Sequence, residues 1–533
     1  MFIDCQPQFR TFGWSIRERV LTWVRQHWLL FGFAALTVTT GCLWRPYIDA
    51  PLHVDAAGYA LAAYWWSQGD TLYQDISITR PQGIFVVFRL IEAVGFGDAR
   101  GIHLVGAAVC LLSALLLWWI AARVWGRAIG LSAAIVFVVL MSVPALEGPT
   151  VNAELFMLPA ILLSLALLLC ADDVDHDSPA RYCLLLSSGL SAAIAVLLKP
   201  AGIAAFPFAI LWLLRHKWRS RITWRVACGE IATVSIGLGL GLLPALIHGM
   251  LTVPERYLYD VYLYRLGQDS VANNGLAYQA YHLLRSGAFI VSRLVILPLA
   301  AFGLWRVRRA SSLQRDLLWL WIVTWFAGVS LGGNWYPHYF QQLVPPFAIA
   351  LVLCLPRVCQ RARSRPQIVV QGIALVGSVQ LLVTILSVQL PHQAEERLFV
   401  KSDPENYTPS AISSPLAAYI REHTTPDESI YVVYHRADIY YLASRRPAAR
   451  WLYIRELVLT PGAFADQEAR LTDPQTAPTY IVGMQPFNVY GLDAHGQIRA
   501  AIAREYRLET TIAGIPLYRR IDRPSVTSGV QEQ

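Results

Sequence analysis

The sequence has few charged residues for its length. Of its 533 residues, 15% are Asp, Glu, Lys or Arg and 55% are hydrophobic, and the mean hydropathy is +0.42. Soluble domains carry about 25% charged residues, so much of this chain must face something other than water. Apolar stretches close to the ~20 residues that cross a bilayer recur along its first three quarters. The composition therefore predicts a polytopic α-helical membrane protein.

Cysteine is scarce, and its placement argues against two further classes. All eight cysteines precede Pro366 and no CxxC pair occurs, so we expect no disulfide framework, redox pair or zinc site. The sequence also lacks an internal repeat, which argues against transporters built from repeated halves. Its C-terminal part has no glycine-rich phosphate cradle.

The positive charge comes in short tracts. The formal net charge is +8, but the arginines gather between apolar stretches, in RVWGR, RHKWRSR, RVRR and RVCQRARSR. Such tracts are typical of cytoplasmic loops, so orientation explains the charge and no nucleic-acid partner is expected. Residues 1–25 are basic without the layout of a cleavable signal, which indicates that the first span is retained.

With the arginine tracts held inside, about eleven spans are expected, with the N-terminus inside and the C-terminus outside. The first is expected at Trp28–Trp44 and the eighth at 287–305. Residues 45–100 then form a first outer loop. The acidic loop DDVDHDSPAR should be cytoplasmic yet offers one arginine, Arg181, although acidic residues count little in the charge rule.

The composition changes after Pro391. The strand patterns SIYVV, APTYIVG and TTIAGIPLYRRI alternate with helical patterns, among them QIRAAIAREYRL. This predicts a small α/β domain at 391–521 on the outer side, following a membrane domain at 1–390. Residues 522–533 are expected to be a disordered tail.

The first outer loop contains a polar and aromatic stretch, HVDAAGYALAAYWWSQGDTLYQDISITRPQGIF, at residues 53–85. Apolar residues from Ala56 to Trp66 fall at helical spacing, which predicts a helix at the membrane surface. Asp55 at its head either caps the helix by accepting backbone N–H groups or acts as a base. An interfacial helix with solvated acids is the alternative that needs no function.

Two cations in this topology are suited to a phosphate. Arg80 precedes Pro81, which keeps the arginine extended, and its planar guanidinium matches phosphate oxygens. Lys199 stands before Pro200 between two apolar spans. A charge among helices costs about 2.5–3.5 kcal/mol, so such a lysine usually finds a partner or snorkels to the interface.

Together these pieces resemble a known superfamily. An acid after the first span, followed by LYxD and RPxG before an apolar run, resembles lipid-linked-sugar glycosyltransferases related to protein O-mannosyltransferases and aminoarabinose transferases. The matching segments are HVDAAGYALAAYWWSQGDTLYQDISITRPQGIFVVFRL, GPTVNAELFMLPAILL, AVLLKPAGIAAFPF and HYFQQLVPPFAIAL. The resemblance spans nearly the whole chain. It implies the GT-C fold and an inner-membrane enzyme whose active site and C-terminal domain are extracytoplasmic.

The resemblance also implies a reaction. The donor would be a polyprenyl-phosphate sugar, and the acceptor a protein, lipid or glycan. Asp55 would be the general base, Arg80 would meet the donor phosphate, and Glu154, in preference to Glu147, would be the second acid. One-step attack would invert the anomeric carbon.

Position in the topology assigns the remaining site residues. They are Lys199 and His338 at the donor phosphate, and Tyr59, Tyr339 and Glu147 at the substrate. Relatives often have an acid or histidine before the cation, where Thr79 stands here. This chain also lacks an obvious ligand where relatives bind a metal, so a divalent metal is allowed but not indicated, and no other cofactor is expected.

Two other functions compete with this hypothesis. A transporter or flippase of a lipid-linked or anionic substrate predicts ionisable residues near the middle of the spans. Here the charges stand at span ends on one side, which favours chemistry at the membrane surface. A non-catalytic assembly or sensor protein would leave Asp55 and Arg80 without a shared task.

Overall fold

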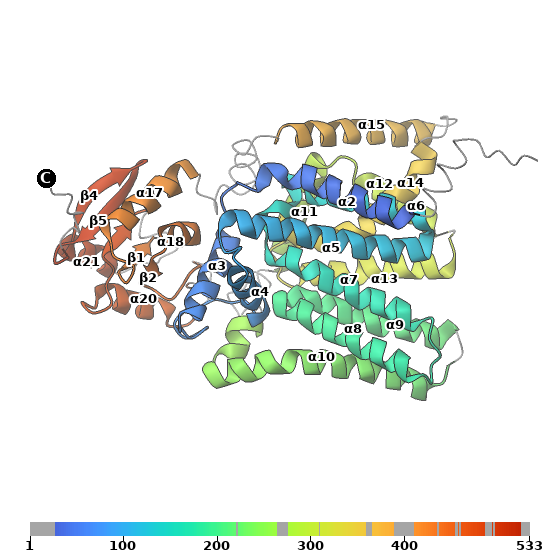
Figure 1. Cartoon of the computed structure of the whole chain (residues 1–533), viewed down its shortest axis with the longest axis horizontal. Coiled ribbons are helices and arrows are strands. Elements are labelled where there is room, and N and C mark those ends of the chain that lie inside the picture. Colours follow the sequence, from blue (N-terminus) through green and yellow to red (C-terminus); the bar gives the residue numbers. More distant parts are fainter. Residues whose placement is uncertain are drawn as a thin grey trace, which may run out of the picture.

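The computed structural model describes residues 27–219, 222–263, 275–308, 310–358, 365–388, 410–433, 436–453, 457, 460–484, 493 and 496–523. A bundle of long helices fills one part of the molecule, and a small sheet domain lies beyond one end of the bundle, with two short helices between them (Figure 1). We call this end of the bundle the domain end and the opposite one the far end. The start of the expected outer domain at residue 391, and all but the first two residues of the expected tail, lie outside the described residues.

The bundle confirms the prediction of a polytopic helical protein. Its helices are α2 (Trp28–Trp44), α5 (Ala99–Trp125), α6 (Arg127–Met141), α7 (Ala153–Ala171), α8 (Pro179–Leu198), α9 (Ala205–Arg219), α10 (Trp224–Thr252), α11 (Gly275–Arg293), α12 (Pro298–Val307), α13 (Ser312–Ser330), α14 (Val344–Val358) and α15 (Arg365–Leu386). Among the described residues, six helices are long and apolar enough to cross a membrane, or seven if the bent pair α11–α12 forms one span. The chain is a multi-pass membrane protein, and the count of eleven spans stays a prediction.

The expectation of one continuous span at 287–305 is wrong. The chain breaks between α11 and α12, which are bent by 96°. Pro298 opens α12, and a proline lacks the N–H donor that would continue the helix. The amide of Gln380 in α15 satisfies the broken backbone, because it donates to the Ser292 carbonyl at 2.7 Å and accepts the Val295 N–H at 2.9 Å.

The two short helices between bundle and sheet are α3 (Val54–Ser67) and α4 (Gln82–Ala93). The predicted helix at 56–66 is therefore confirmed. The interpretation of Asp55 as its cap is wrong, because the N-cap is His53, whose Nδ1 accepts the Asp55 N–H at 3.3 Å. In the first turn of α4, a Cβ on Gly83 would lie 2.6 Å from the Leu197 carbonyl oxygen. Glycine thus lets α4 approach the end of α8 closely.

The C-terminal part is an α/β unit, as predicted. It contains α17 (Ser410–His423), β1 (Ser429–Val432), α18 (Ala437–Ala443), β2 (Arg446–Pro447), α20 (Ala463–Thr472), β3 (Tyr480–Val482), α21 (Gln497–Glu505), β4 (Tyr506–Ile512) and β5 (Ile515–Arg520). The strand order is β2-β1-β3-β5-β4, with β1 parallel to both neighbours and β5 antiparallel to both of its own.

The last strand pattern of the sequence differs from the structure. TTIAGIPLYRRI forms a hairpin of β4 and β5 rather than one strand, and the predicted helix before it ends at Glu505. The turn is made by Ala513 and Gly514, whose φ values of 49° and 82° are both left-handed. A turn with two left-handed residues matches the right-handed twist of paired strands, so the chain forms a hairpin here and not one continuous strand.

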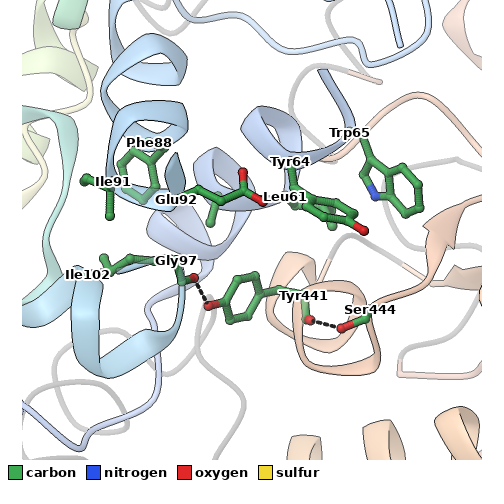
Figure 2. Close-up of a pocket in the computed structure, with 11 residues that line it drawn as sticks. Leu61, Tyr64, Trp65, Phe88, Ile91, Glu92, Gly97, Ile102, Tyr441 and Ser444 are labelled. Atoms are coloured by element: carbon green, nitrogen blue, oxygen red, sulfur yellow. Dashed lines mark hydrogen bonds between the residues drawn. The ribbon is translucent and has the colours of Figure 1, made fainter. Parts of the chain in front are cut away.

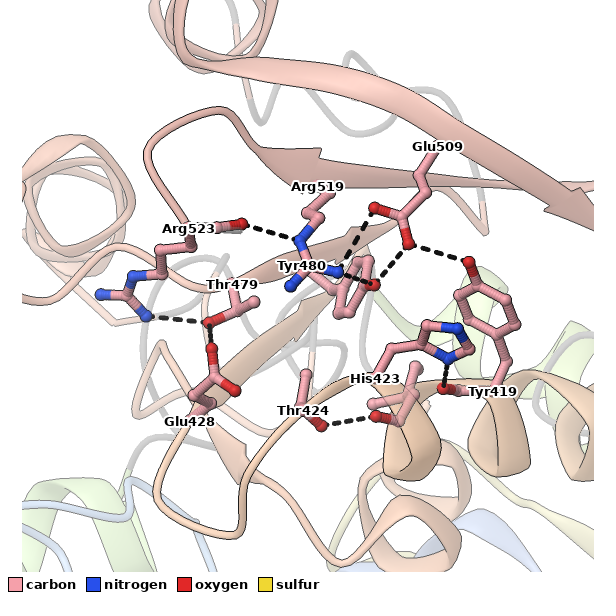
Figure 3. Close-up of polar contacts among 10 residues, drawn as sticks. Tyr419, His423, Thr424, Glu428, Thr479, Tyr480, Glu509, Arg519 and Arg523 are labelled. Carbon is pink, nitrogen blue, oxygen red and sulfur yellow. Dashed lines mark hydrogen bonds and ion pairs between the residues drawn. The ribbon is translucent and has the colours of Figure 1, made fainter. Parts of the chain in front are cut away.

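A polar network ties α17 to the sheet (Figure 3). The Glu509 carboxylate accepts hydrogen bonds from the hydroxyls of Tyr419 at 2.8 Å and Tyr480 at 2.6 Å. The buried Arg519 guanidinium donates to the Tyr480 hydroxyl at 2.8 Å and lies 3.5 Å from Glu509. A buried charge is tolerated when it is paired and hydrogen-bonded in this way.

The C-terminal unit also holds the loop that contains α3. The Ser77 N–H donates to the Arg450 carbonyl at 2.8 Å, and Asp70 forms an ion pair with Arg446. The Tyr453 hydroxyl donates to the Asp55 carbonyl at 3.4 Å. The C-terminal unit therefore holds this loop both at Asp55 and beyond the end of α3.

Candidate active site

Helix ends place two charged residues at the domain end of the bundle. Glu154 is the second residue of α7, and Lys199 follows the last residue of α8. Lys199 is extended, with φ −155° and ψ 134°, because the next residue is Pro200, which disfavours helical geometry before it. Both charges thus lie at the ends of apolar helices rather than inside them.

Five of the predicted site residues meet there in one buried cluster. Glu154 forms an ion pair with Lys199, and the Nε2 atom of His338 lies 3.6 Å from Glu154 Oε1. The Nδ1 atom of His338 lies 2.6 Å from Glu147 Oε2. The Lys199 ammonium stands 3.8 Å from the ring centroid of Tyr339. None of the five is more than 9% exposed, so their charges depend on one another for compensation.

The backbone around this cluster is strained. Glu147, Val151 and Trp335 have φ values of 52°, 56° and 52°, in the left-handed region that side chains other than glycine rarely adopt. Such residues cost about 1–3 kcal/mol each and persist where the surrounding structure demands them. All three lie in the connections that present Glu147, Glu154 and His338.

Arg80 and Asp55 approach a common residue, Tyr59. The Arg80 Nε atom lies 3.3 Å from the Tyr59 hydroxyl, and the Arg80 carbonyl accepts the Tyr73 hydroxyl at 2.8 Å. Asp55 lies one helical turn before Tyr59 on the same face of α3. Burial raises the pKa of Tyr59, and the negative charge of Asp55 raises it further, whereas Arg80 lowers it.

Tyr59 also links the two groups of residues. The phenol of Tyr339, whose ring faces the Lys199 ammonium, is near enough to raise the pKa of Tyr59 slightly as well. Within the described residues, the Asp55 carboxylate makes no hydrogen bond or ion pair. It is thus a partly exposed carboxylate beside a tyrosine, an arginine and the buried cluster.

An apolar pocket of about 350 Å³ opens beside the cluster. Glu154, Lys199 and Tyr339 form part of its wall, and Tyr262 and Gln342 complete the polar lining. The rest is aliphatic side chains and backbone of α8, the 3-10 helix η4 (Pro200–Ala204), α10, α13 and the turn after α13. A pocket with an apolar wall and a cation at one side suits a ligand that is partly hydrocarbon and partly anionic.

Buried amides at the site were missed as functional candidates. Gln342 is 1% exposed, and its Oε1 atom has no hydrogen-bond partner among the described residues. The same holds for both side-chain polar atoms of Asn152. The signal in the sequence is the pair of glutamines in HYFQQLVPPF. Buried side-chain amides normally make hydrogen bonds, so two of them in an apolar segment indicate a structural or binding role.

The residues present do not fit a metal ion. Among the described residues, no group of three His, Cys, Asp or Glu side chains is arranged to hold one. Glu147, Glu154 and His338 already contact one another or Lys199. No catalytic step is therefore assigned to a metal.

Comparisons with known proteins agree with this fold. Residues 79–240 match the family model described as dolichyl-phosphate-mannose-protein mannosyltransferase. ArnT from Cupriavidus metallidurans, solved with undecaprenyl phosphate, superposes with a TM-score of 0.62 at 15% identity, over 92% of this chain and 97% of that one. The fold is that of the GT-C superfamily of membrane glycosyltransferases.

A second GT-C structure extends the comparison. The archaeal oligosaccharyltransferase AglB from Archaeoglobus fulgidus, with an inhibitory peptide and a dolichol-phosphate, gives a TM-score of 0.53 at 12% identity, over 94% of this chain and 75% of that one. No curated protein matches the sequence significantly. The GT-C resemblance drawn from the motifs is confirmed. The matched family segment contains Arg80, Glu154 and Lys199 but not Asp55 or His338.

Proposed function

We propose that this GT-C protein transfers a sugar from a polyprenyl-phosphate donor to an acceptor hydroxyl on the extracytoplasmic side of the membrane. The observation that carries the proposal is that the Asp55 carboxylate, which has no hydrogen bond or ion pair among the described residues, lies one turn from Tyr59, the partner of Arg80, while Lys199 borders an apolar pocket. The relatives solved with undecaprenyl phosphate and with a dolichol-phosphate support a donor of this kind.

The donor would occupy the apolar pocket with its first isoprene units. Its phosphate would lie between Lys199, at the pocket wall, and Arg80, which Tyr59 holds in position. Glu154 keeps Lys199 in place, and His338 joins Glu154 to Glu147. These acids fix the cation, because an unpaired ammonium would not remain in so apolar a wall.

The reaction forms a bond between the acceptor oxygen and the anomeric carbon and breaks the bond from that carbon to the phosphate oxygen. The bonding electrons leave with the phosphate, whose new negative charge is stabilised by Arg80 and Lys199. The acceptor proton passes to Asp55. An ordinary aspartate is a weak base, so alignment with the hydroxyl in the transition state supplies most of its effect. Attack opposite the leaving phosphate inverts the anomeric carbon.

The deciding experiment incubates the purified protein in lipid with a panel of polyprenyl-phosphate sugars and acceptor lipids, glycans and peptides, with products identified by mass spectrometry. We expect release of polyprenyl phosphate together with one glycosylated acceptor. In the same assay, Arg80→Ala should raise the KM for the donor and lower kcat. Ion- or potential-driven uptake in sealed vesicles, without any sugar transfer, would instead establish a transporter.

A further inference from the structure

A second pocket lies between the bundle and the C-terminal unit (Figure 2). It has a volume of about 230 Å³ and is lined from three elements on the bundle side, α3, α4 and the start of α5, and from α18 on the other. Tyr441 of α18 closes one wall, and its hydroxyl donates to the Gly97 carbonyl at 2.7 Å. The pocket is thus built by contacts between the two parts of the chain.

The pocket contains one charged group, the Glu92 carboxylate. Figure 2 shows it directed into the space between Phe88 and Tyr64. Within the described residues, this carboxylate makes no hydrogen bond or ion pair, and the nearest cation on its own helix, Arg89, lies over the Trp66 ring at 4.6 Å. Burial raises the pKa of Glu92, and Arg89 lowers it only in part. Among the described residues, this partly buried negative charge is thus held without an ion-pair partner, with Arg89 acting on it from a distance.

Aromatic rings line the same pocket. Tyr64 and Trp65 from α3, Phe88 from α4 and Tyr441 from α18 all line the pocket. Ring faces attract cations, and several rings around one position are a common way to bind an ammonium group. A carboxylate among such rings favours a cation that can also donate hydrogen bonds.

The protein surface next to the pocket is apolar. Leu90, Val94 and Phe96, on α4 and the turn after it, are 61%, 67% and 42% exposed. Phe96 directly precedes Gly97 of the pocket wall. In a multi-pass membrane protein, an exposed apolar patch beside a helix at the end of the bundle is suited to contact with lipid tails.

We propose that this pocket binds the primary ammonium headgroup of a membrane lipid. The ammonium would donate to Glu92 and lie among the aromatic rings, while the acyl chains would extend over Leu90, Val94 and Phe96. The site is distinct from the pocket of the glycosyl-transfer centre, because the two share no lining residue. Phe88 in its wall packs against Tyr59, with ring centroids 5.7 Å apart. A bound lipid would join α3 and α4 to α18.

The test measures lipid retention by the full chain. Purified protein in nanodiscs of equimolar phosphatidylethanolamine and phosphatidylglycerol is released into native mass spectrometry, and retained lipids are counted. We expect one phosphatidylethanolamine retained by the unmodified protein. Glu92→Gln keeps the shape of the side chain but removes its charge, and should lower that retention about tenfold. Tyr64→Leu should lower it as well, through loss of the ring.

Matched controls make the result decisive. Glu422→Gln, the same change at an exposed position of α17, should leave retention unchanged. Equal retention of phosphatidylglycerol, or undiminished phosphatidylethanolamine in Glu92→Gln, would overturn the proposal. Displacement of the lipid by an equal concentration of soluble ethanolamine phosphate would overturn the lipid as its source. Because no sugar transfer is measured, failure here leaves the proposed enzymatic function untouched.

Discussion

The two ends of the bundle carry similar charged residues in different surroundings. At the far end, Arg181 donates to Glu230 of α10 at 2.5 Å and to the main-chain carbonyls of Ala171 and Val174, where α7 ends. His176 lies 2.6 Å from the same glutamate. At the domain end, the cluster of Lys199 lines a pocket of about 350 Å³.

Burial does not distinguish the two clusters, since Arg181 is 1% and Lys199 6% exposed. Their neighbours do. Arg181 satisfies the free carbonyls at a helix C-terminus and so completes a piece of secondary structure. The Lys199 ammonium lies in the wall of the pocket and over the ring face of Tyr339. A buried charge that meets main-chain acceptors stabilises the fold, whereas one that borders an open apolar pocket is a candidate for ligand binding.

The largest effect should come from Asp55, whose carboxylate has no partner among the described residues. Asp55→Asn removes the proposed base and should lower kcat by about 10²–10⁴-fold, the usual range for general-base catalysis. Its melting temperature should hardly change, because the carboxylate makes no bond within the described residues. Asp75→Asn in the same loop, where the carboxylate accepts the Thr71 N–H at 2.8 Å, is the matched control and should remain active. Near-normal turnover in Asp55→Asn would end the assignment of this base.

The next prediction compares the same change, a cation replaced by methionine, in the two clusters. Lys199→Met should lower kcat/KM about 100-fold through loss of phosphate stabilisation. Arg181→Met should leave the activity of the folded protein unchanged but destabilise it by about 3–5 kcal/mol, because the buried Glu230 loses its guanidinium partner and keeps His176, and the carbonyls of Ala171 and Val174 lose their donor. Transfer assays and thermal unfolding of both variants decide this.

Loss of a partner could mimic loss of function at Lys199. The double variant Glu154→Gln/Lys199→Met removes both charges and should regain stability without regaining transfer. Restored transfer in that variant would mean that Lys199 serves only to neutralise Glu154. The comparison between the bundle ends would then fail.

Much of the fold could be predicted from sequence because the signals were local. Apolar length and arginine tracts placed helices where the structure has them, and β-branched runs placed β1 and β3. The break at Pro298 was missed, because it depends on an amide from α15 that satisfies the opened backbone. The β4–β5 hairpin was missed because Ala513 adopts a left-handed conformation that only the pairing of the strands requires.

The site was predictable in its residue types but not in its connections. Motifs and span ends pointed to Asp55, Arg80 and Lys199 one by one. The pairing of His338 with Glu147 joins residues 191 positions apart, and no local pattern encodes it. Gln342 could be recognised only from its unpartnered oxygen and its place in the pocket wall.

Gln341 and Gln342 allow the same comparison within one residue type, between a side chain that bonds to the main chain and one that lines the pocket. Gln341 donates to the Leu146 carbonyl at 2.9 Å, whereas Gln342 lines the pocket. Gln342→Leu should raise the KM for the donor about tenfold, the effect of losing one or two hydrogen bonds to the ligand, with the melting temperature retained. Gln341→Leu should lower the melting temperature and leave KM unchanged. Donor titrations and thermal unfolding test the pair, and equal KM values in both variants would contradict the division.

The smallest effect concerns a buried carboxylate of the C-terminal unit. Asp438 in α18 is 7% exposed, and burial raises its pKa to about 6, with Arg436 acting in the opposite direction. An unfolded aspartate has a pKa near ~3.9, so above pH about 6 the carboxylate is ionised in both states and its burial costs at most about 3 kcal/mol.

As the pH falls from about 6 to about 4, the folded state takes up the proton first and this cost disappears. Asp438→Asn should therefore raise the melting temperature at pH 7.5 and have no such effect at pH 4, while transfer continues. The exposed Asp427→Asn should change neither. A stabilisation that does not depend on pH would show that the charge of Asp438 is not the source of the destabilisation. Loss of transfer would mean that this carboxylate, whose charge acts on His53 beside Asp55, also serves the reaction.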